Sequence, residues 1–325
     1  MSKPQNASRL TGWVERYLAH RSALGHRNRG ENSVLKALLR QVEKCACRDL
    51  KDSCFESWLA GINSLHPNTR RKYYQIARLF CLYRRRSEPG CFVPSADGAA
   101  KLQPYITPVI VEPDQIARVL ALASKLPRTV NSPLRPEAMR LAVVLLYTCG
   151  LRLGELLRLT LGDVEENDTV LRIRESKFHK SRLVPLAKTT TGELRSYLLQ
   201  RRKQFAVHPH TPLLCTRHGA PLRPYSAPGF HFAFRTLFKA AGVCDDQGKL
   251  PRIHDLRHTF AVQALIRWYQ EGADVQSNLP KLALYMGHVS IESSAYYLHW
   301  VPSLRSLASN RFEQKFGRLV KGGAL

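Results

Sequence analysis

The sequence predicts a mainly α-helical protein of two domains, with one small β-hairpin in the second domain. Apolar residues recur at intervals of three and four over most of the chain, which is the period of amphipathic helices. The segment from Pro94 to Pro108 lacks this period and contains three prolines, which is typical of a linker. Two short segments, 169–175 and 181–186, alternate between apolar and polar residues, and they predict a pair of strands.

The first domain is expected to be helical throughout residues 1–105, with the linker within about 95–112. Helical spacing of apolar residues runs from Thr11 to roughly Arg86, and no convincing alternating strand interrupts it. One helix is predicted to start at Asn68-Thr69, because these residues follow Pro67 and can cap a helix. The apolar positions of this helix share one face: Tyr73, Ile76, Ala77 and Phe80.

The second domain is expected to cover residues 113–325, because a new helical pattern begins at Glu112-Pro113-Asp114. Three helices, at about 114–125, 136–149 and 154–160, precede the hairpin. The chain then returns to helices at about 191–205, 227–241, 255–271, 279–286 and 290–299. Helix therefore dominates this domain too, and the hairpin is its one predicted β element.

The charge of the chain predicts a polyanionic partner. It holds 50 Lys and Arg against 25 Asp and Glu, for a formal net charge of +25. Residues 1–105 contribute 19 cations and 8 acids, so both halves of the chain carry the excess. The longest apolar run, around 141–146, is far shorter than the roughly 18–20 residues of a membrane span. Nucleic acid is therefore the expected partner, and a membrane is not.

Cysteine usage predicts a reduced, cytoplasmic protein without a metal site. The eight cysteines show no repeated spacing, and the N-terminus leads into no apolar signal region. Cys45-Ala46-Cys47 is the one close pair. It is a poor zinc signature, because a single residue separates the cysteines and no matched second pair exists.

Cations gather on the predicted helix near residue 70 and just after it. They could contact DNA phosphates along a groove, or they could simply form a solvated helix face. Few acids are interleaved to pair with them, which favours DNA contact. The candidates are Arg70, Arg71, Lys72, Arg78, Arg84, Arg85 and Arg86.

The first chemically informative cluster is Gly150-Leu151-Arg152-Leu153-Gly154-Glu155. Gly150 can end one helix in a left-handed turn, so that Arg152 opens the next beside free backbone donors. Glu155, one turn away, can orient the guanidinium. Arginines so placed bind phosphate well, although Arg-x-x-Glu pairs are also common surface salt bridges.

The second cluster is the basic tip of the predicted hairpin, with Lys177, Lys180 and Arg182. A lysine there can reach into a DNA groove and donate a proton to a departing oxygen. An ordinary solubilising turn would have the same composition. The hairpin by itself does not decide between these interpretations.

The third and fourth clusters are His254-Asp255-Leu256-Arg257 and a segment from Gly287 to Tyr297. His254 and Arg257 lie three residues apart on a predicted helix, so they can converge on one phosphate. Gly287 is expected to stop a helix, His288 follows, and two adjacent tyrosines come eight and nine residues later. Of two such tyrosines, one is expected to pack and the other to enter a site.

These clusters occur in order over residues 148–297, and together they resemble the tyrosine site-specific recombinases of the phage integrase family. The resemblance implies the family's fold, with a helical core DNA-binding domain over 1–105 and an α-rich catalytic domain over 113–325. The stretch 267–276 lengthens the path between the third and fourth clusters, and it is similar to transposon-borne members. Mobile elements are therefore one expected context.

The resemblance also implies a role for each cluster. Arg152 and Arg257 would clamp the scissile phosphate, with Lys177 as general acid on the leaving oxygen. His254 and His288 would complete the ring of donors. The family's spacing from Gly-His selects Tyr297 as the nucleophile, and Tyr296 is expected to pack.

The expected activity is site-specific DNA recombination through a 3′-phosphotyrosyl intermediate, without metal, cofactor or ATP. It would serve integration, excision or resolution of transposon cointegrates. A type IB topoisomerase would share the chemistry, and a DNA-binding protein with a decayed site is a third possibility. A metal-dependent nuclease is the weaker alternative, because no Asp/Glu cluster stands among the motifs.

The expected partners are a double-stranded recombination site and further copies of the chain, as a dimer on one site and a tetramer in the synaptic complex. An accessory DNA-binding protein could join them. In the family, a C-terminal segment docks on a neighbouring protomer, and here residues 301–325 have apolar spacing that suits an amphipathic helix. Packing of this tail on its own protomer is the alternative.

Overall fold

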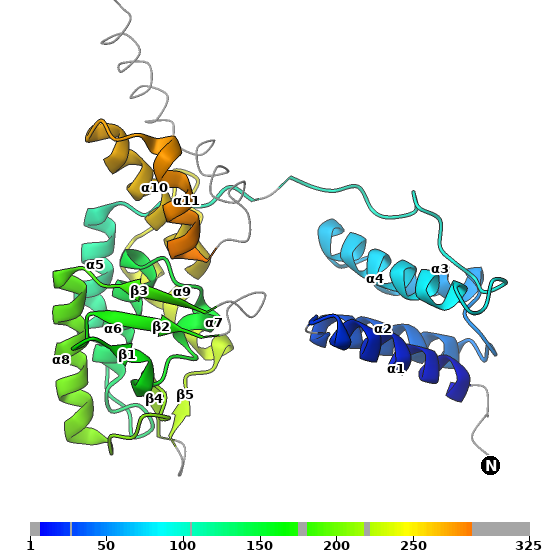
Figure 1. The fold of residues 1–325 in the computed structure, drawn as a ribbon, viewed down its shortest axis with the longest axis horizontal. Helices are drawn as coiled ribbons and strands as arrows, with labels where there is room; N and C mark the ends of the chain where they lie inside the picture. Colours follow the sequence, from blue (N-terminus) through cyan, green and yellow to red (C-terminus); the bar gives the residue numbers. More distant parts are fainter. Residues whose placement is uncertain (1–6, 27, 105, 175–180, 218–221, 288–325) are drawn as a thin grey trace, which may run out of the picture. The chain divides into compact units, whose positions relative to one another are not determined.

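The computed structural model describes residues 7–26, 28–104, 106–174, 181–217 and 222–287, which form two compact units (Figure 1). The first unit is Met1–Ile106 and the second is Thr107–Leu325. The division falls inside the segment for which the sequence predicts a linker. The predicted fold class is confirmed: the described residues are mainly helical, with two small sheets in the second unit.

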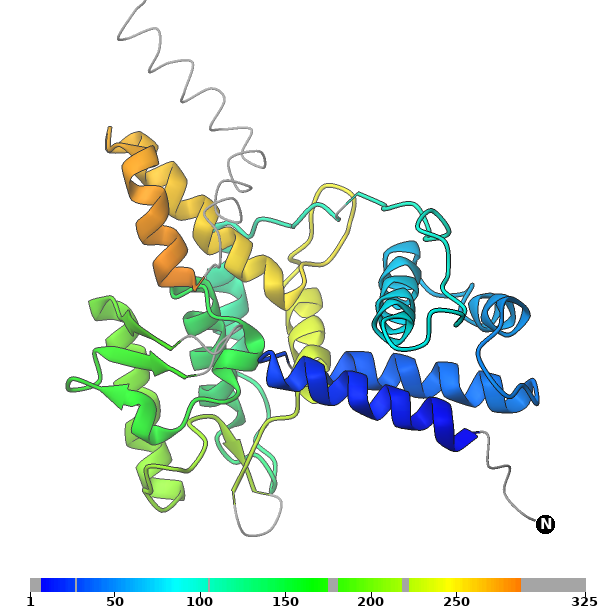
Figure 2. The same cartoon turned by 45° about the vertical axis from the view of Figure 1, so that its right-hand side comes forward.

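The first unit is built from four helices: α1 (Ala7–Ala23), α2 (Arg29–Lys44), α3 (Asp52–Gly61) and α4 (Pro67–Arg85). α1 and α2 lie side by side in both ribbon views (Figures 1 and 2). All four helices contribute to one apolar core, in which Leu35, Phe55 and Phe80 are almost completely buried. The aromatic side chains make this core continuous, since Phe55 lies edge-on to Tyr74 at 5.4 Å between ring centroids.

α4 begins at Pro67, before the predicted caps Asn68 and Thr69, and a different residue caps it. Pro67 is the first residue of the helix, where its missing N–H costs nothing. The cap is His66, whose Nδ1 accepts from the Asn68 backbone N–H at 3.2 Å. Of the predicted apolar face, Ile76, Ala77 and Phe80 are buried. Tyr74 is buried as well, whereas Tyr73 is only partly covered.

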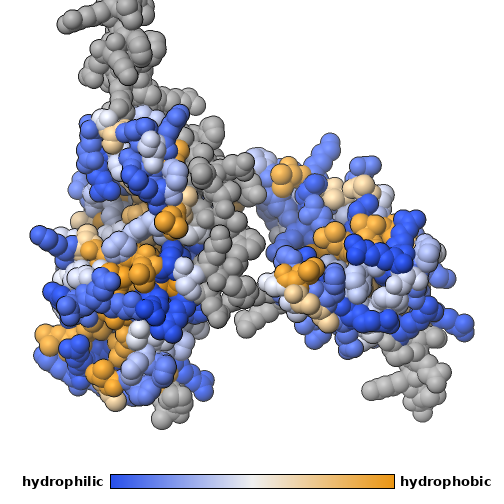
Figure 3. All heavy atoms as spheres, viewed as in Figure 1, coloured by the Kyte–Doolittle hydropathy of each residue, from blue (hydrophilic) through white to orange (hydrophobic). Residues whose placement is uncertain are grey.

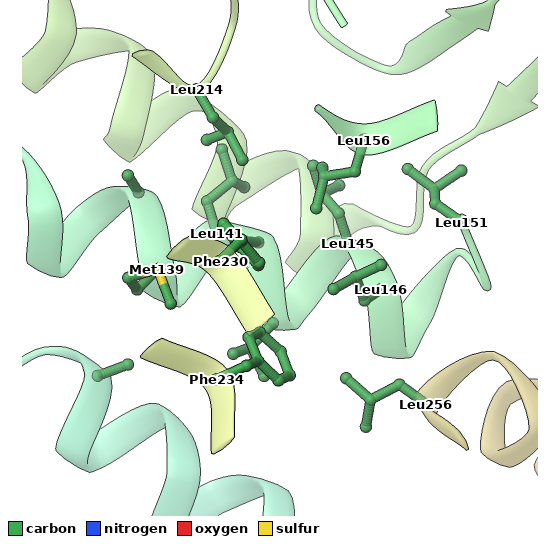
Figure 4. Close-up of a cluster of buried hydrophobic side chains, with 14 of the residues drawn as sticks. Met139, Leu141, Leu145, Leu146, Leu151, Leu156, Leu214, Phe230, Phe234 and Leu256 are labelled. Atoms are coloured by element: carbon green, nitrogen blue, oxygen red, sulfur yellow. The ribbon is translucent and has the colours of Figure 1, made fainter. Parts of the chain in front are cut away.

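The second unit is organised around helix α6 (Arg135–Thr148), which passes through the centre of an apolar core (Figure 4). α5 (Pro113–Ala123), α8 (Lys188–Gln204), α9 (Ala227–Ala240) and the start of α10 (Ile253–Gln270) complete that core. Phe230 and Phe234 of α9 point toward α6 from one side, and Leu151 and Leu156 approach from the other. Leu156 is in the four-residue helix α7 (Leu153–Leu156), shorter than the predicted 154–160.

A three-stranded antiparallel sheet lies beside these helices. The predicted hairpin is confirmed as β2 (Val170–Ile173) and β3 (Arg182–Pro185), with Ile173 opposite Arg182 in the register. β1 (Val164–Glu165) adds a third strand, and the turn η1 (Leu161–Asp163) precedes it. A separate two-stranded sheet joins β4 (Cys215–Thr216) to β5 (Arg223–Pro224).

Hydrophilic side chains cover much of the face seen in Figure 3, with hydrophobic patches among them.

The last described element is α11 (Val275–Met286), which packs against the second half of α10 (Figure 2). Asp274 caps it by accepting from the backbone N–H groups of Gln276 and Ser277, so the helix begins four residues before the predicted position 279. Gly287 ends it in the left-handed region at φ 68°, as the sequence predicts. None of the helices in the described ranges combines the length and apolar character that a membrane crossing requires.

Candidate active site

Arg152 stands at a helix start that a glycine turn prepares. Gly150 follows α6 with φ 59°, a conformation that favours glycine. A Cβ at this position would also lie 2.6 Å from the ring of Phe260. Arg152 then precedes α7, and its backbone N–H donates to Glu155 Oε2 at 3.0 Å. The predicted turn and helix start are therefore confirmed.

Glu155 binds two guanidinium groups. Arg152 Nη1 donates to Glu155 Oε1 at 2.8 Å, so the acid orients this arginine as predicted. Arg182 reaches both carboxylate oxygens, with Nη1 3.2 Å from Oε1 and Nη2 2.9 Å from Oε2. Burial alone would raise the pKa of the Glu155 carboxyl, but the bonds and charge of Arg182, supported by Arg152, lower it to about 2. The carboxylate is therefore ionised at neutral pH.

Arg257 lies on α10 and is only 1% exposed. Its Nη1 donates to the Gly150 carbonyl, and its Nη2 donates to the Met286 carbonyl at 2.7 Å. These acceptors belong to the glycine turn before Arg152 and to the end of α11. Arg257 therefore links the third cluster to the first, and it also binds Met286, the residue just before the fourth cluster.

His254 lies in the first turn of α10, on the same helix as Arg257. Its ring is at the surface, yet the surrounding protein limits its hydration, and His258, Arg257 and Arg152 add unfavourable charge. These effects lower the pKa of His254 to about 4. The imidazole is therefore neutral at physiological pH, and one of its nitrogens can accept a proton.

The structure thus brings Arg152 and Arg257 to the C-terminal end of α11, with Glu155 bound to Arg152 and His254 within reach of the charges of both arginines. Arg152 Nη2 donates to the Gly287 carbonyl at 3.1 Å, next to the Met286 carbonyl that Arg257 uses. Glu155 orients Arg152, and the charge of Arg152 reaches His254. The other predicted residues of this site lie outside the described residues: Lys177, Lys180, His288, Tyr296, Tyr297 and the tail 301–325.

Arg182 corrects an expectation, because the sequence marks it as a DNA contact. Its side chain is 7% exposed and faces the protein interior. In addition to the Glu155 contacts, its Nε donates to the Tyr285 carbonyl at 2.8 Å. Because Glu155 and the end of α11 bind its guanidinium inside the protein, Arg182 cannot reach a DNA phosphate at the surface.

Apart from Arg84, the predicted cations of the first unit fall into two groups. Lys72, Arg85 and Arg86 are exposed, as a DNA contact requires. Arg70, Arg71 and Arg78 are half-buried, and the latter two donate to backbone carbonyls of the segment that follows α4.

Arg84 is the second correction. Its side chain is 6% exposed and forms ion pairs with Asp49 and Glu88, so it stabilises the fold of the first unit. The two acids explain why this arginine is turned inward, and sequence reasoning did not connect them to it. Arg84 is therefore not a DNA phosphate contact in this geometry.

Sequence reasoning also missed residues that support the site. Thr259 Oγ1 accepts from the Val111 backbone N–H at 3.0 Å and donates to the Asp255 carbonyl at 2.9 Å, which ties the segment before α5 to α10. His258 lies 4.8 Å from His254 between ring centroids. Its spacing of four residues from His254 is the signal that could have found it.

Two further features describe the surroundings of the site. A hollow of about 800 Å³ adjoins Glu155 and Arg182, and three more arginines line it: Arg158, Arg172 and Arg174. Among the described residues, no group of three or more His, Cys, Asp or Glu side chains is placed to hold a metal ion.

Comparison with known proteins identifies the family. The model of the phage integrase family matches residues 110–302. The chain is 31% identical over 306 residues to the putative integrase/recombinase y4rB of Sinorhizobium fredii, covering 93% of this chain and 96% of that protein. It is 33% identical over 310 residues to y4rE of the same organism, again a putative integrase/recombinase, covering 92% and 94%.

Solved structures share the fold. XerH site-specific recombinase bound to its difH substrate aligns with a TM-score of 0.64 and 14% identity, covering 91% of this chain and 95% of that chain. The Tn1549 transposon integrase in complex with transposon right end DNA aligns with a TM-score of 0.63 and 17% identity, covering 94% and 98%. The chain belongs to the phage integrase family, and it is a tyrosine recombinase, an enzyme that breaks and rejoins DNA.

Proposed function

We propose that this enzyme is a site-specific recombinase in which Tyr297 attacks a DNA phosphate and forms a 3′-phosphotyrosyl intermediate. The observation that carries the proposal is the convergence of Arg152 and Arg257 on adjacent carbonyls at the end of α11. His288 follows α11 directly, and Tyr297 comes nine residues after it. Arg152 and Arg257 are therefore hydrogen-bonded to the end of the helix after which the chain continues to Tyr297.

Arg152 and Arg257 offset the charge that develops on the phosphate. Attack by a phenolate on a phosphodiester adds negative charge to the nonbridging oxygens, and preorganised cations stabilise it. Their carbonyl contacts hold both guanidinium groups in place before DNA binds, which limits reorganisation during the reaction. Removing one such donor typically costs about 100- to 1000-fold in rate.

Proton transfer completes the cleavage step. A tyrosine hydroxyl has an ordinary pKa near 10, so at neutral pH Tyr297 needs an acceptor for its proton. The lowered pKa of His254 keeps its imidazole neutral, so a ring nitrogen can accept a hydrogen bond from the Tyr297 hydroxyl and take its proton as the new bond forms. Lys177 donates a proton to the departing 5′ oxygen, and His288 hydrogen-bonds the phosphate.

The products of cleavage favour strand exchange. The phosphotyrosyl ester keeps the energy of the broken phosphodiester bond, so a 5′ hydroxyl of a second strand can attack it and release Tyr297 without ATP. The arginines supply the positive charge, so no metal is required. We assign the enzyme to integration, excision or transposon cointegrate resolution. Two of its relatives are putative integrase/recombinases, which favours a role in recombination or integration.

The two units take different parts in DNA binding. Residues 1–105 form the core DNA-binding domain, using Lys72, Arg85 and Arg86 with Arg70, Arg71 and Arg78 beside them. Residues 113–325 form the catalytic domain. Copies bind one site as a dimer and two sites as a tetramer, with the tail 301–325 docked on a neighbour and an accessory DNA-binding protein as an optional partner. The free cysteines suit action in the reducing cytoplasm.

Capture from a randomised library tests the proposal and identifies a substrate. Nicked duplexes with a random central segment are incubated with the enzyme in EDTA without ATP, and DNA that stays bound in SDS is sequenced. Two duplexes with the captured sequence should then exchange strands. Relaxation of a supercoiled plasmid without any exchanged product would instead indicate a topoisomerase. Binding without any covalent complex would refute the catalytic proposal.

A further inference from the structure

Three successive carbonyls at the end of α11 each accept a hydrogen bond from a different arginine. Arg182 Nε donates to Tyr285, Arg257 Nη2 to Met286 and Arg152 Nη2 to Gly287, at 2.8, 2.7 and 3.1 Å. The last carbonyls of a helix have no partner within the helix and carry partial negative charge. Two of these arginines are the proposed phosphate ligands, and the third is Arg182.

Arg182 is also the main partner of Glu155. The guanidinium contacts both oxygens of the carboxylate, while Arg152 contacts one oxygen with its side chain. The side chains of Glu155 and Arg182 are 2% and 7% exposed, whereas that of Arg152 is 25% exposed. The acid and Arg182 therefore form a buried pair, and Arg152 faces outward from it.

A second arginine beside Glu155 changes the net charge of the site. Glu155 and Arg152 alone would sum to zero, and the buried acid would weaken the attraction of Arg152 for a phosphate. With Arg182 the group of three carries a net charge of +1. The interior screens these charges poorly, so the sign of the group matters at the site.

We propose that Arg182 is a positioning residue for DNA cleavage: it takes up the negative charge of Glu155, so that Arg152 stays oriented by the acid and yet keeps its positive charge for the scissile phosphate. This inference rests on the proposed function, because it assigns a role within the same site. Arg182 does not touch the DNA in this account.

The end of α11 is shaped to receive this arginine. Gly287 has φ 68°, and a Cβ at this position would lie 2.8 Å from Arg182 Nη1. The planar guanidinium supplies two parallel donors to Glu155 and a third to the Tyr285 carbonyl. A lysine keeps the charge but lacks this fork, so it cannot make the same three contacts.

The first measurement compares Arg182→Met with the wild type on the nicked duplexes captured above, at saturating enzyme. We expect the rate of covalent-complex formation to fall roughly 10- to 100-fold, as is typical when a residue that orients a ligand is lost. DNA affinity should stay within about threefold, since Arg182 is buried. The control is Arg195→Met, an arginine of α8 that is paired with Asp168 on the surface, and it should cleave at the wild-type rate.

The second measurement separates charge compensation from a merely structural role. Once Glu155→Gln has removed the acid, Arg182 has no charge to neutralise. The double variant Glu155→Gln/Arg182→Met should therefore cleave within about threefold of Glu155→Gln alone, and faster than Arg182→Met. It also lacks both buried charges, so it is expected to fold even where Arg182→Met does not.

The outcomes distinguish this inference from the proposed function. A wild-type enzyme that forms no covalent complex refutes the proposed function itself. A wild-type enzyme that cleaves, with Arg182→Met cleaving equally fast, overturns only the role of Arg182. A double variant at least tenfold slower than Glu155→Gln alone overturns it as well, because the effect of Arg182 would then not pass through the acid.

Discussion

Replacement of Gly150 by alanine should destabilise the second unit through two separable effects. The first is the left-handed backbone at φ 59°, which costs a residue with a Cβ about 1–2 kcal/mol. The second is the clash with Phe260, whose Cδ1 lies 2.6 Å from the added Cβ, and overpacking of this kind costs about 1–3 kcal/mol. We expect a total loss of about 2–5 kcal/mol in the free energy of unfolding, measured by urea titration.

Gly242 provides the matched control. It has nearly the same backbone angle, φ 62°, but a Cβ there would meet nothing within 4 Å. Gly242→Ala should therefore show the backbone cost alone, and Gly150→Ala should be less stable by about 2 kcal/mol, or roughly 4–8 °C in melting temperature. Equal losses in the two variants would refute the packing argument. Because the Gly150 carbonyl also holds Arg257, only Gly150→Ala should slow DNA cleavage.

Three further predictions concern charged groups. The pKa of Glu155 is lowered to about 2, so its contribution to stability should be complete above about pH 5 and lost toward pH 2. Between pH 6 and pH 3, urea unfolding should show a loss of about 2 kcal/mol in the wild type and less in Glu155→Gln. His254 should titrate near pH 4 in an NMR experiment on the free enzyme, and a value near 6.5 would contradict the account. Arg84→Met should cost about 2 kcal/mol in unfolding free energy, because Asp49 loses its ion pair and Glu88 keeps only Arg9 and Trp13 as partners. Exposed Arg85→Met should cost less than about 0.5 kcal/mol.

The sequence predicted helices well where local signals agree. α9 was expected at 227–241 and runs from Ala227 to Ala240, because Ser226 caps it and its phenylalanines keep a helical period. α11 was placed too late, because Pro280 is typical of a first turn, whereas the capping Asp274 starts the helix earlier. The strands β1, β4 and β5 have two residues each, which is too short for any alternation to be visible.

The site was predictable in its local parts and not in its long-range pairs. Gly150, Arg152 and Glu155 lie within six residues, so the turn and the ion pair follow from spacing alone. Arg182 is 27 residues from Glu155, and Arg84 is 35 residues from Asp49. Charge and hydrophilicity give both arginines the pattern of surface residues. Burial of an arginine depends on an acid brought near by the fold, which a single sequence does not reveal.

Mass spectrometry of the residue that DNA attaches to decides whether Tyr297 is the nucleophile. The covalent complex on captured duplexes is digested with protease and nuclease, and the peptide that carries the nucleotide is identified by mass spectrometry. We expect a 3′-phosphotyrosine on Tyr297, formed by the wild type and by Tyr296→Phe but not by Tyr297→Phe. A nucleotide attached to any other residue, or a complex that persists in Tyr297→Phe, would contradict it.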